Sequence, residues 1–337
     1  ATPSAFLKDY PSEPFSTLFP LLNSADYFSV YPLVIQVISA FGALVANDLY
    51  LASLIIKLPI LLAEIGIIWM LPRLMVQLNL NPKLSLWYFL NPLIIVELTG
   101  NAHFEGLMIF FTLIAIKMIV LKKYKRGALA LALGVATKLI PLLLFPFLLK
   151  ALPKKARIPF TIVFIVGCLA LFAPLLNPTF IVHFSASIDL YFRSFEFNAS
   201  VYYVVREIGS LLVGYNLIGL IGPSLFLLSA LSLLYFWWKQ VPFLLNDALK
   251  SSLYALSIYY IMATTVHPWY ISMLLMLGIL SARVYPVIWT MAAFLSYFAY
   301  QTAAYEESYW LIAFEYALVA LAFARPIWLK QWLSSAR

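Results

Sequence analysis

The stretch NPLIIVELTGNAHFEGLMIFF, residues 91–111, sets two apolar runs around the short polar segment GNAHFEG at 100–106. Such runs continue through almost the whole chain of 337 residues, of which 64% are hydrophobic and 11% are charged. The mean hydropathy of +0.94 lies far outside the range of soluble globular domains. Because the runs are continuous and not alternating, they indicate membrane-spanning helices and not barrel strands. The sequence therefore predicts a polytopic membrane protein.

The apolar segments predict an all-α transmembrane bundle of about ten to eleven spans, some of them short or re-entrant. We expect residues 1–337 to form a single domain. The candidate spans are 49–71, 85–100, 104–121, 127–150, 158–176, 216–238, 251–266, 270–282, 286–300 and 310–325.

The distribution of charge predicts how these spans are oriented. The loops KKYKRG (122–127) and KALPKKAR (150–157) are strongly basic, so the positive-inside rule places them, and the C-terminus, in the cytoplasm. This makes the net charge of +8 a topology signal and not an indication of nucleic-acid binding. Most Asp and Glu residues fall on the opposite, extracytoplasmic side, which we call the outer face. We therefore expect the chemistry of this protein to take place at the outer face.

Three segments depart from simple spans. Residues 127–150 lie between the two basic loops and carry Lys138 and two prolines, so we expect two short helices that enter the membrane and return, with Lys138 near the tip. Residues 1–48 form a first outer loop with an interfacial or re-entrant helix at 31–46, because a full span there would place KKYKRG outside. Residues 177–215 form a second outer loop with amphipathic helices lying on the membrane.

The chain opens with ATPSAFLKDYPSEPF, residues 1–15, which has neither an initiator Met nor the basic and apolar regions of a signal peptide. A polytopic protein needs a first segment that directs it into the membrane. We therefore expect a further span upstream of Ala1.

The polar segment at 100–106 holds the first candidate site. Glu97, Asn101 and Glu105 would share one face of a continued helix, whereas a turn at Gly100 would gather Asn101, His103 and Glu105. Both arrangements put carboxylate and imidazole groups at the membrane boundary, where an acid is costly unless it is paired or used. The structural alternative is a solvated loop that caps two spans.

Cationic and aromatic residues on the outer side complete the candidate set. Lys138 could receive a phosphate, or it could be a structural cation paired with a buried acid. His267 and Tyr270, in HPWY at 267–270, could contact a phosphate, although aromatic residues are ordinary at span ends. Arg206 is one of few outer basic residues and could bind a phosphate bidentately.

Other kinds of site lack support. The single cysteine, Cys168, precludes a disulfide within the chain and a Cys-based metal site. The sequence has no HExxH motif and no glycine-rich nucleotide loop. No cofactor is therefore predicted, although the outer acids could hold a divalent cation.

Five stretches, in this order, resemble bacterial GT-C glycosyltransferases similar to polyprenyl-phosphate-mannose-dependent mannosyltransferases. They are VYPLVIQVISAFGAL (30–44), LNPLIIVELTGNAHFEGLMI (90–109), LALGVATKLIPLLLFPFLL (131–149), FNASVYYVVREIG (197–209) and HPWYISMLLML (267–277). The resemblance covers nearly the whole chain, but as a pattern of weak motifs.

The resemblance implies an enzyme of the bacterial plasma membrane whose active site faces outward. It would pass a sugar, mannose first of all, from a polyprenyl-phosphate donor to a lipid, glycan or protein acceptor, usually with inversion. Family members carry a key acid soon after their first span, and this sequence has no such stretch. We therefore expect that acid upstream of Ala1, or Glu105 in its place.

The residues take hypothetical roles on this basis. Glu105 is the second acid or substitute base, with His103 beside it as a second candidate catalytic group. Asn101 and His103 hold acceptor or sugar hydroxyls, near Glu97. His267, Lys138 and Arg206 bind the lipid phosphate, near Tyr270.

Two other functions compete with the enzyme. A transporter or flippase of lipid-linked sugars would also need an outer cavity, but it should place ionisable residues near the midplane of both halves. A non-catalytic subunit of a membrane complex is the second alternative, because the first-loop acid is missing.

Overall fold

The computed structural model describes residues 2–4, 8, 19–22, 25–176, 178–193, 195–301 and 305–324. These residues form helices and connections without any strand, apart from one isolated bridge between Phe197 and Thr265. The all-α helical bundle is thus confirmed. Its main elements are α3 (Leu33–Val45), α4 (Leu49–Gln77), α5 (Leu86–Phe89), the π-helix η3 (Ile94–Gly100), α6 (Glu105–Val120), α7 (Tyr124–Thr137), η4 (Ile140–Leu144), α8 (Phe145–Ala151), α9 (Lys154–Phe172), α10 (Pro178–Arg193), α11 (Val201–Val213), α12 (Ile218–Lys239), α13 (Leu245–Met262), η6 (Pro268–Tyr270), α14 (Ile271–Leu280), α15 (Tyr285–Ala292), η7 (Ala293–Gln301) and α16 (Tyr309–Ala324).

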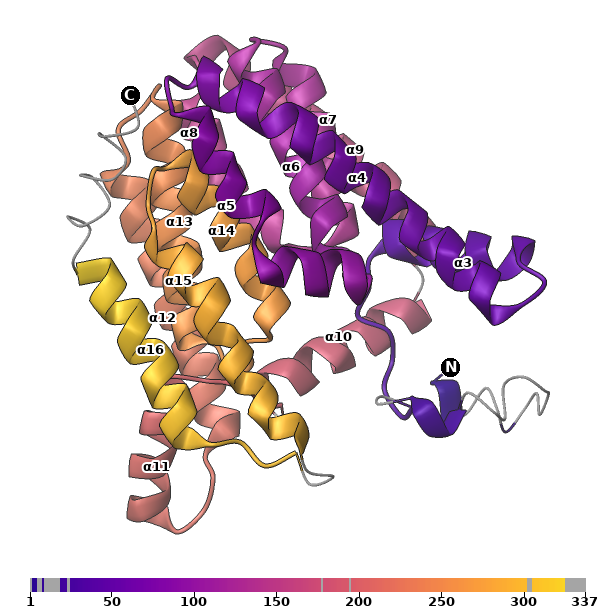
Figure 1. Ribbon diagram of the computed structural model, residues 1–337, viewed down its shortest axis with the longest axis vertical. Coiled ribbons are helices and arrows are strands. Elements are labelled where there is room, and N and C mark those ends of the chain that lie inside the picture. The colour runs from indigo at the N-terminus through magenta and orange to yellow at the C-terminus, as the bar shows by residue number, and fades with distance from the viewer. Residues whose placement is uncertain are drawn as a thin grey trace.

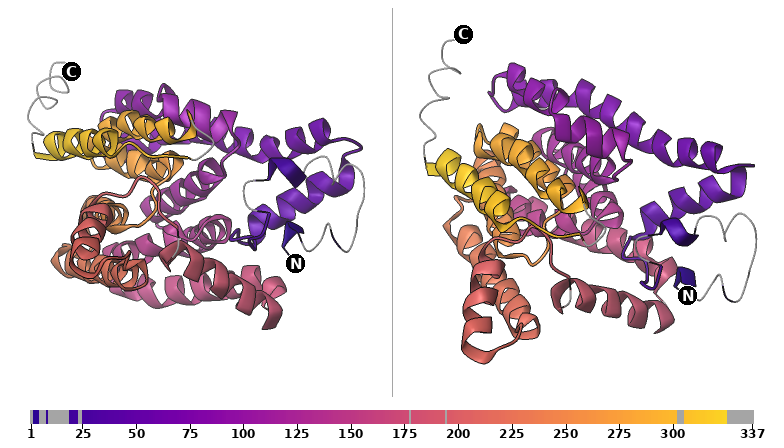
Figure 2. Two further views of the ribbon diagram at one scale, coloured as in Figure 1. Left: turned by 90° about the horizontal axis from the view of Figure 1, so that it is seen from below. Right: turned by 60° about the horizontal axis from the view of Figure 1, so that its bottom comes forward.

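The helices pack in two groups. Helix α6 lies against α7 and α4, and α7 lies against α9, so these four form one side of the bundle. Helices α12 to α16 form the other side, with α13 packed against α12 and α14, and α15 against α16 (Figure 1). Helix α10 runs across one end of the molecule, next to the N-terminal segment, and α11 projects beside the start of α12 (Figures 1 and 2).

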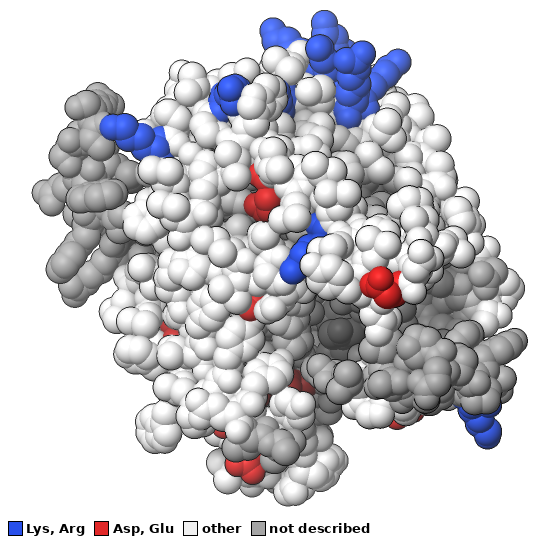
Figure 3. All heavy atoms as spheres, turned by 45° about the vertical axis from the view of Figure 1, so that its right-hand side comes forward, with Lys and Arg blue, Asp and Glu red and all other residues white. Residues whose placement is uncertain are grey.

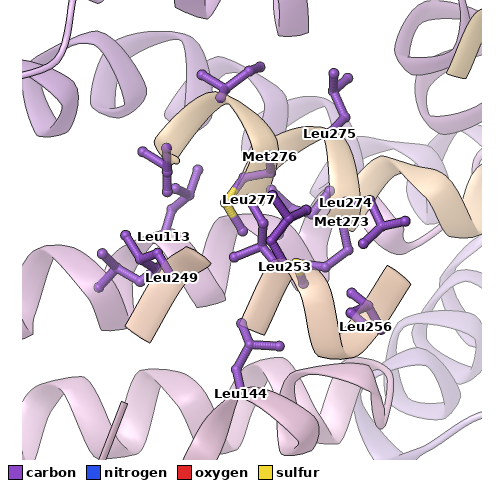
Figure 4. Close-up of a cluster of buried hydrophobic side chains, with 14 of the residues drawn as sticks. Leu113, Leu144, Leu249, Leu253, Leu256, Met273, Leu274, Leu275, Met276 and Leu277 are labelled. Atoms are coloured by element: carbon purple, nitrogen blue, oxygen red, sulfur yellow. The ribbon is translucent and has the colours of Figure 1, made fainter. Parts of the chain in front are cut away.

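The core is centred on α14, because all ten of its residues are buried. A helix that is apolar on every side must be surrounded by other helices. Figure 4 shows Met276 and its neighbours packed against Leu113 of α6, Leu144 of η4 and Leu253 of α13. The two groups of helices therefore meet around α14.

Among the described residues, three helices are long and apolar enough to cross a membrane: α4 with 29 residues, and Lys154–Leu175 and Ile218–Lys239 with 22 residues each. The bent pair of η3 and α6 would make a fourth. Shorter apolar helices, at 33–45, 140–151, 268–280 and 309–324, accompany them in the described part of the chain. The number of ten to eleven spans stays a prediction.

Proline accounts for one difference from the expected spans. The segment 85–100 was expected as one helix, but α5 ends at Phe89 and η3 begins only at Ile94. Between them, Pro92 cannot donate a backbone hydrogen bond, and Asn91 accepts from Leu93 N with its side chain at 3.0 Å. The segment 286–300 is likewise divided, into α15 and the 3₁₀-helix η7.

The break predicted inside 127–150 is confirmed. Helix α7 ends at Thr137, Lys138 is extended, and Pro141 opens the next short helical stretch at 140–151. The helices expected in the two outer loops are also present, as α3 for 31–46 and as α10 and α11 within 177–215. Their position at the membrane surface stays a prediction.

On the face drawn in Figure 3, most Lys and Arg side chains gather at one end, whereas the orientation of the helices in a membrane stays a prediction. The acidic side chains lie elsewhere on this face. Residues 5–7, 9–18, 23–24 and 325–337 lie outside the described residues, and with them much of the first outer loop and the C-terminus predicted to be cytoplasmic.

Candidate active site

A sharp bend after Gly100 positions the first group of candidate residues. The π-helix η3 and α6 meet at 103°, so the turn and not the continuous helix is the arrangement found. Ala102, in this turn, has φ of 59°, a left-handed conformation that costs a non-glycine residue about 1–2 kcal/mol. Lys57 Nζ donates to the Gly100 carbonyl at 2.7 Å, so α4 supports the bend. Strain of this kind gathers at functional sites.

Glu97 organises the polar residues on one side of the bend. Its side chain is buried, and Oε2 accepts from Asn101 Nδ2 at 3.1 Å and lies 3.3 Å from His103 Nε2. One carboxylate oxygen thus holds both neighbours in place.

Glu105 faces the other way, because the bend separates it from this cluster. Its carboxylate is buried, and Oε1 is ion-paired with Lys138 Nζ, which comes from the break after α7. The second oxygen, Oε2, is buried and has no hydrogen-bond partner among the described residues. The Lys138 ammonium also lies 5.7 Å from the Tyr31 ring and 5.9 Å from the Tyr270 ring. The structural alternative considered for Lys138, a cation paired with a buried acid, is what the structure contains.

Glu105 and Lys138 line a cavity of ≈ 280 Å³. His267 and Tyr270 also line it, which brings four of the sequence-predicted site residues together. The other wall residues come from the segment before α3, from α6, from the start of η4, from α10, from the end of α13 and the residues after it, and from η6. They are Val30, Tyr31, Pro32, Met108, Leu139, Ile140, Phe184, Tyr259, Tyr260, Ala263, Thr264, Thr265 and Trp269.

A stack of four aromatic rings connects the cavity with the Glu97 cluster. The Trp269 indole lies between His103, at 3.9 Å between ring centroids, and His267, at 4.5 Å. Phe197 stacks on the far side of His267 at 4.8 Å. Asn101, His103 and Glu97 therefore lie behind Trp269 and not on the cavity wall.

His267 is held neutral by its surroundings. Burial lowers its pKa to about 3, with a smaller effect from the nearby charge of Lys138 and from His103. Its buried Nδ1 has no hydrogen-bond partner in the described part of the chain. At neutral pH the ring can therefore exchange hydrogen bonds with a ligand but adds no positive charge.

The structure does not bring Arg206 to this cavity. Its guanidinium is ion-paired with Glu196 and with Glu207, the latter at 2.7 Å, and it donates to Tyr309 Oη at 3.0 Å. These hydrogen bonds raise the pKa of Arg206 further above its ordinary value, against the effect of burial. A guanidinium already engaged by two carboxylates is poorly placed to bind a phosphate.

Tyr31, Tyr260 and Trp269 also line the cavity, although the sequence did not indicate them as parts of the site. Trp269 stands in the HPWY motif, but it was explained as an aromatic residue of the membrane interface. Only its ring contacts with His103 and His267 distinguish Trp269 from an ordinary aromatic residue of the interface. In the described residues, no group of three or more His, Cys, Asp or Glu side chains could hold a metal ion.

Comparison with known proteins adds a second line of information. Residues 26–154 match the family of alpha-(1->6)-mannopyranosyltransferases, in its N-terminal domain. Over 128 residues the chain is 26% identical to alpha-(1->6)-mannopyranosyltransferase A of Mycobacterium tuberculosis. Over this part of its length, the chain is therefore similar to alpha-(1->6)-mannopyranosyltransferases.

The similarity to mannosyltransferases covers a limited region. It spans 38% of this chain and 24% of the mycobacterial relative. Glu97, Asn101, His103, Glu105 and Lys138 all lie within the matched residues 26–154, whereas Arg206, His267 and Tyr270 lie beyond them. No solved structure shows significant similarity to the chain.

Proposed function

We propose that this protein is a mannosyltransferase that takes mannose from a polyprenyl-phosphate donor and passes it to a hydroxyl of a lipid, glycan or protein acceptor. The observation that carries the proposal is the Glu105–Lys138 ion pair at the cavity wall, within the region similar to alpha-(1->6)-mannopyranosyltransferases. Transfer of a sugar from a phosphate needs a carboxylate that takes the proton of the acceptor and a cation that stabilises the departing phosphate.

The reaction forms one bond and breaks another. The acceptor oxygen attacks the anomeric carbon, while the bond from that carbon to the phosphate oxygen breaks and its electrons leave with the polyprenyl phosphate. Glu105 takes the proton of the acceptor hydroxyl as general base. A single displacement of this kind inverts the anomeric configuration.

Lys138 stabilises the charge that develops on the departing phosphate. For this, the ammonium has to be shared between the phosphate and Glu105. Before the donor binds, the ion pair with Lys138 compensates the charge of the Glu105 carboxylate. When the donor binds, its phosphate competes for the ammonium, which leaves the Glu105 carboxylate free to accept a proton. His267, which is neutral, contributes a hydrogen bond to the phosphate.

The remaining candidates have indirect roles in this mechanism. Glu97 holds His103, which stacks on Trp269 and so supports the cavity wall.

We also propose that the cavity faces the extracytoplasmic side of a plasma membrane, which agrees with the basic end seen in Figure 3. A divalent cation as helper stays a prediction.

The decisive test compares Glu105→Gln with the unaltered chain. Both are reconstituted in liposomes with labelled polyprenyl-phosphate mannose and a lipid extract as acceptor. We expect the substitution to lower transfer by about 10²–10⁴-fold, because it removes a general base but keeps the shape of the side chain. Glu306→Gln, at an exposed position, is the matched control. Equal transfer by Glu105→Gln would remove Glu105 from the mechanism, and movement of the donor across the bilayer without turnover would indicate a transporter.

A further inference from the structure

A second hollow lies on the other side of α13 from the active-site cavity. It consists of two adjoining cavities of ≈ 460 Å³ and ≈ 640 Å³, which share Ser200, Val201 and Tyr316 as wall residues. We call it the α13–α16 groove. Its walls come from α11, α12, α13, α15 and α16, and Figure 2 shows α16 opposite the α11–α12 pair.

Helix α13 separates the groove from the active-site cavity. Tyr254, Ser257, Ile258 and Ile261 recur at helical spacing and line the groove. Tyr259, Tyr260 and Ala263, on the other side of the same helix, line the cavity with Glu105. The groove is therefore a distinct site.

The interior of the groove presents mainly hydrocarbon to an occupant, because most of its hydroxyl groups are bonded within the protein. Ser200 Oγ donates to the Ile261 carbonyl at 2.8 Å, and Tyr316 Oη donates to the Asn198 carbonyl at 2.8 Å. Ser257 and Tyr285 share a hydrogen bond of 2.6 Å. Such a surface offers a hydrophilic ligand few hydrogen-bonding groups, whereas an alkyl chain needs none.

The groove has an aromatic end and a polar end. Four aromatic rings line the first, with centroids 5.8 Å apart for Phe236 and Tyr254, 5.9 Å for Tyr254 and Phe323, and 5.3 Å for Phe323 and Tyr285. At the other end, Arg206, Glu207 and Tyr309 form the wall. A groove that is polar at one end and apolar along the rest of its length fits an amphiphilic ligand.

The charge at the polar end selects the headgroup. Glu196, Glu207 and Glu307 surround the single guanidinium of Arg206, directly or through Tyr203, which donates to Glu307. Burial raises the pKa of Glu307 and so favours its neutral form, but Glu196 and Glu207 alone outnumber the cation. Glu207 is 63% exposed and so available to a ligand. An acidic mouth repels an anionic headgroup and attracts an ammonium.

We propose that the α13–α16 groove binds one acyl chain of a membrane phospholipid whose headgroup carries an ammonium, with the ammonium at Glu207 and the chain along α16 towards Phe323. The inference is independent of the sugar transfer, because α13 stands between the two sites.

The test measures lipids retained by the full chain. The protein is reconstituted with equal amounts of phosphatidylethanolamine and phosphatidylglycerol, extracted in mild detergent, and its bound lipids are counted by native mass spectrometry. We expect phosphatidylethanolamine to be retained in preference to phosphatidylglycerol. Ala320→Phe, which fills the apolar cavity, should lower the retained lipid by about tenfold. Ala313→Phe fills the mouth cavity and gives a second, independent variant.

Two comparisons make the result specific. Ser224→Phe introduces the same ring at an exposed position of α12 outside the groove and should leave retention unchanged. Glu207→Gln should keep the lipid but remove the headgroup preference. Equal retention by Ala320→Phe, Ala313→Phe and Ser224→Phe would overturn the proposal. Retention of polyprenyl phosphate in place of phospholipid would also overturn it and would assign the groove to the donor.

Discussion

Lys138 Nζ is ion-paired with Glu105 Oε1, which joins the break after α7 to the first residue of α6. The side chain of Glu105 is 3% exposed and that of Lys138 is 17% exposed, so both charges are largely withdrawn from water. Each then depends on the other, because an unpaired charge at this depth is costly.

Substitution of Lys138 alone should therefore lower the free energy of unfolding more than substitution of Lys138 and Glu105 together. Lys138→Met leaves the Glu105 carboxylate buried without a counter-charge and should lower the free energy of unfolding by about 3–5 kcal/mol. In the double variant Lys138→Met/Glu105→Gln, part of this loss should return, with a coupling energy of about 1–3 kcal/mol. Denaturant unfolding in micelles measures the three variants Lys138→Met, Glu105→Gln and Lys138→Met/Glu105→Gln. Additive losses would mean that the pair is not formed in the membrane-protein fold.

Gly106 should not tolerate a methyl group. A Cβ atom there would lie 2.5 Å from Glu64 Oε1, which accepts a hydrogen bond from Tyr88 Oη at 3.1 Å. Gly106→Ala should therefore displace this buried carboxylate and lower the free energy of unfolding by about 1–3 kcal/mol. Gly219→Ala is the matched control, because a Cβ at Gly219 meets nothing within 4 Å. Equal unfolding midpoints for the two variants would show that α4 can yield at Glu64.

The stack around Trp269 should control the shape of the active site. Trp269→Ala removes the ring between His103 and His267, so both imidazoles lose their contact and the cavity wall collapses or opens. Trp269→Phe keeps a ring and should retain most of the stability, since each aromatic pair contributes about 0.5–1.5 kcal/mol. Trp269→Ala should also lower mannose transfer more than Trp269→Phe does. Equal unfolding free energies for the two variants would contradict the role of the stack.

His267 should make the protein less stable in acid. Its ordinary pKa is 6.5, whereas in the folded chain burial, with Lys138 and His103, lowers its pKa to about 3. Between these pH values the unfolded chain binds a proton that the folded chain does not, so the stabilisation is complete above pH 6.5 and decreases as the pH falls towards 3. The contribution is at most about 1.4 kcal/mol per pH unit.

His267→Phe tests this dependence, because it keeps a ring in the stack but removes the titrating group. The free energy of unfolding, measured from pH 7 to pH 4.5, should fall less steeply for this variant than for the unaltered chain. Parallel pH profiles would show that His267 can be protonated without cost in the folded state.

The sequence identified part of the site because some of its residues are conspicuous by type. Glu105 and Lys138 are charges in apolar surroundings, and such charges need a partner or a function wherever they lie. Their separation of 33 residues, however, concealed that they are partners of each other. Arg206 was conspicuous for the same reason, but the sequence did not show that Glu196, ten residues before it, and Glu207, next to it, are both ion-paired with its guanidinium.

The sequence by itself determined that this protein is an all-α membrane bundle, that 127–150 breaks at Lys138, and that polar side chains gather around 97–105. These are local properties, because hydropathy, proline and charge act within a few residues along the chain. The tertiary structure decided that the chain turns at Gly100, that Glu105 pairs with Lys138 while Glu97 holds His103, and that Trp269 joins the two groups. It also separated the Arg206 cluster and the α13–α16 groove from the cavity. Such relationships depend on contacts between helices distant in sequence, and no periodicity within a single segment specifies them.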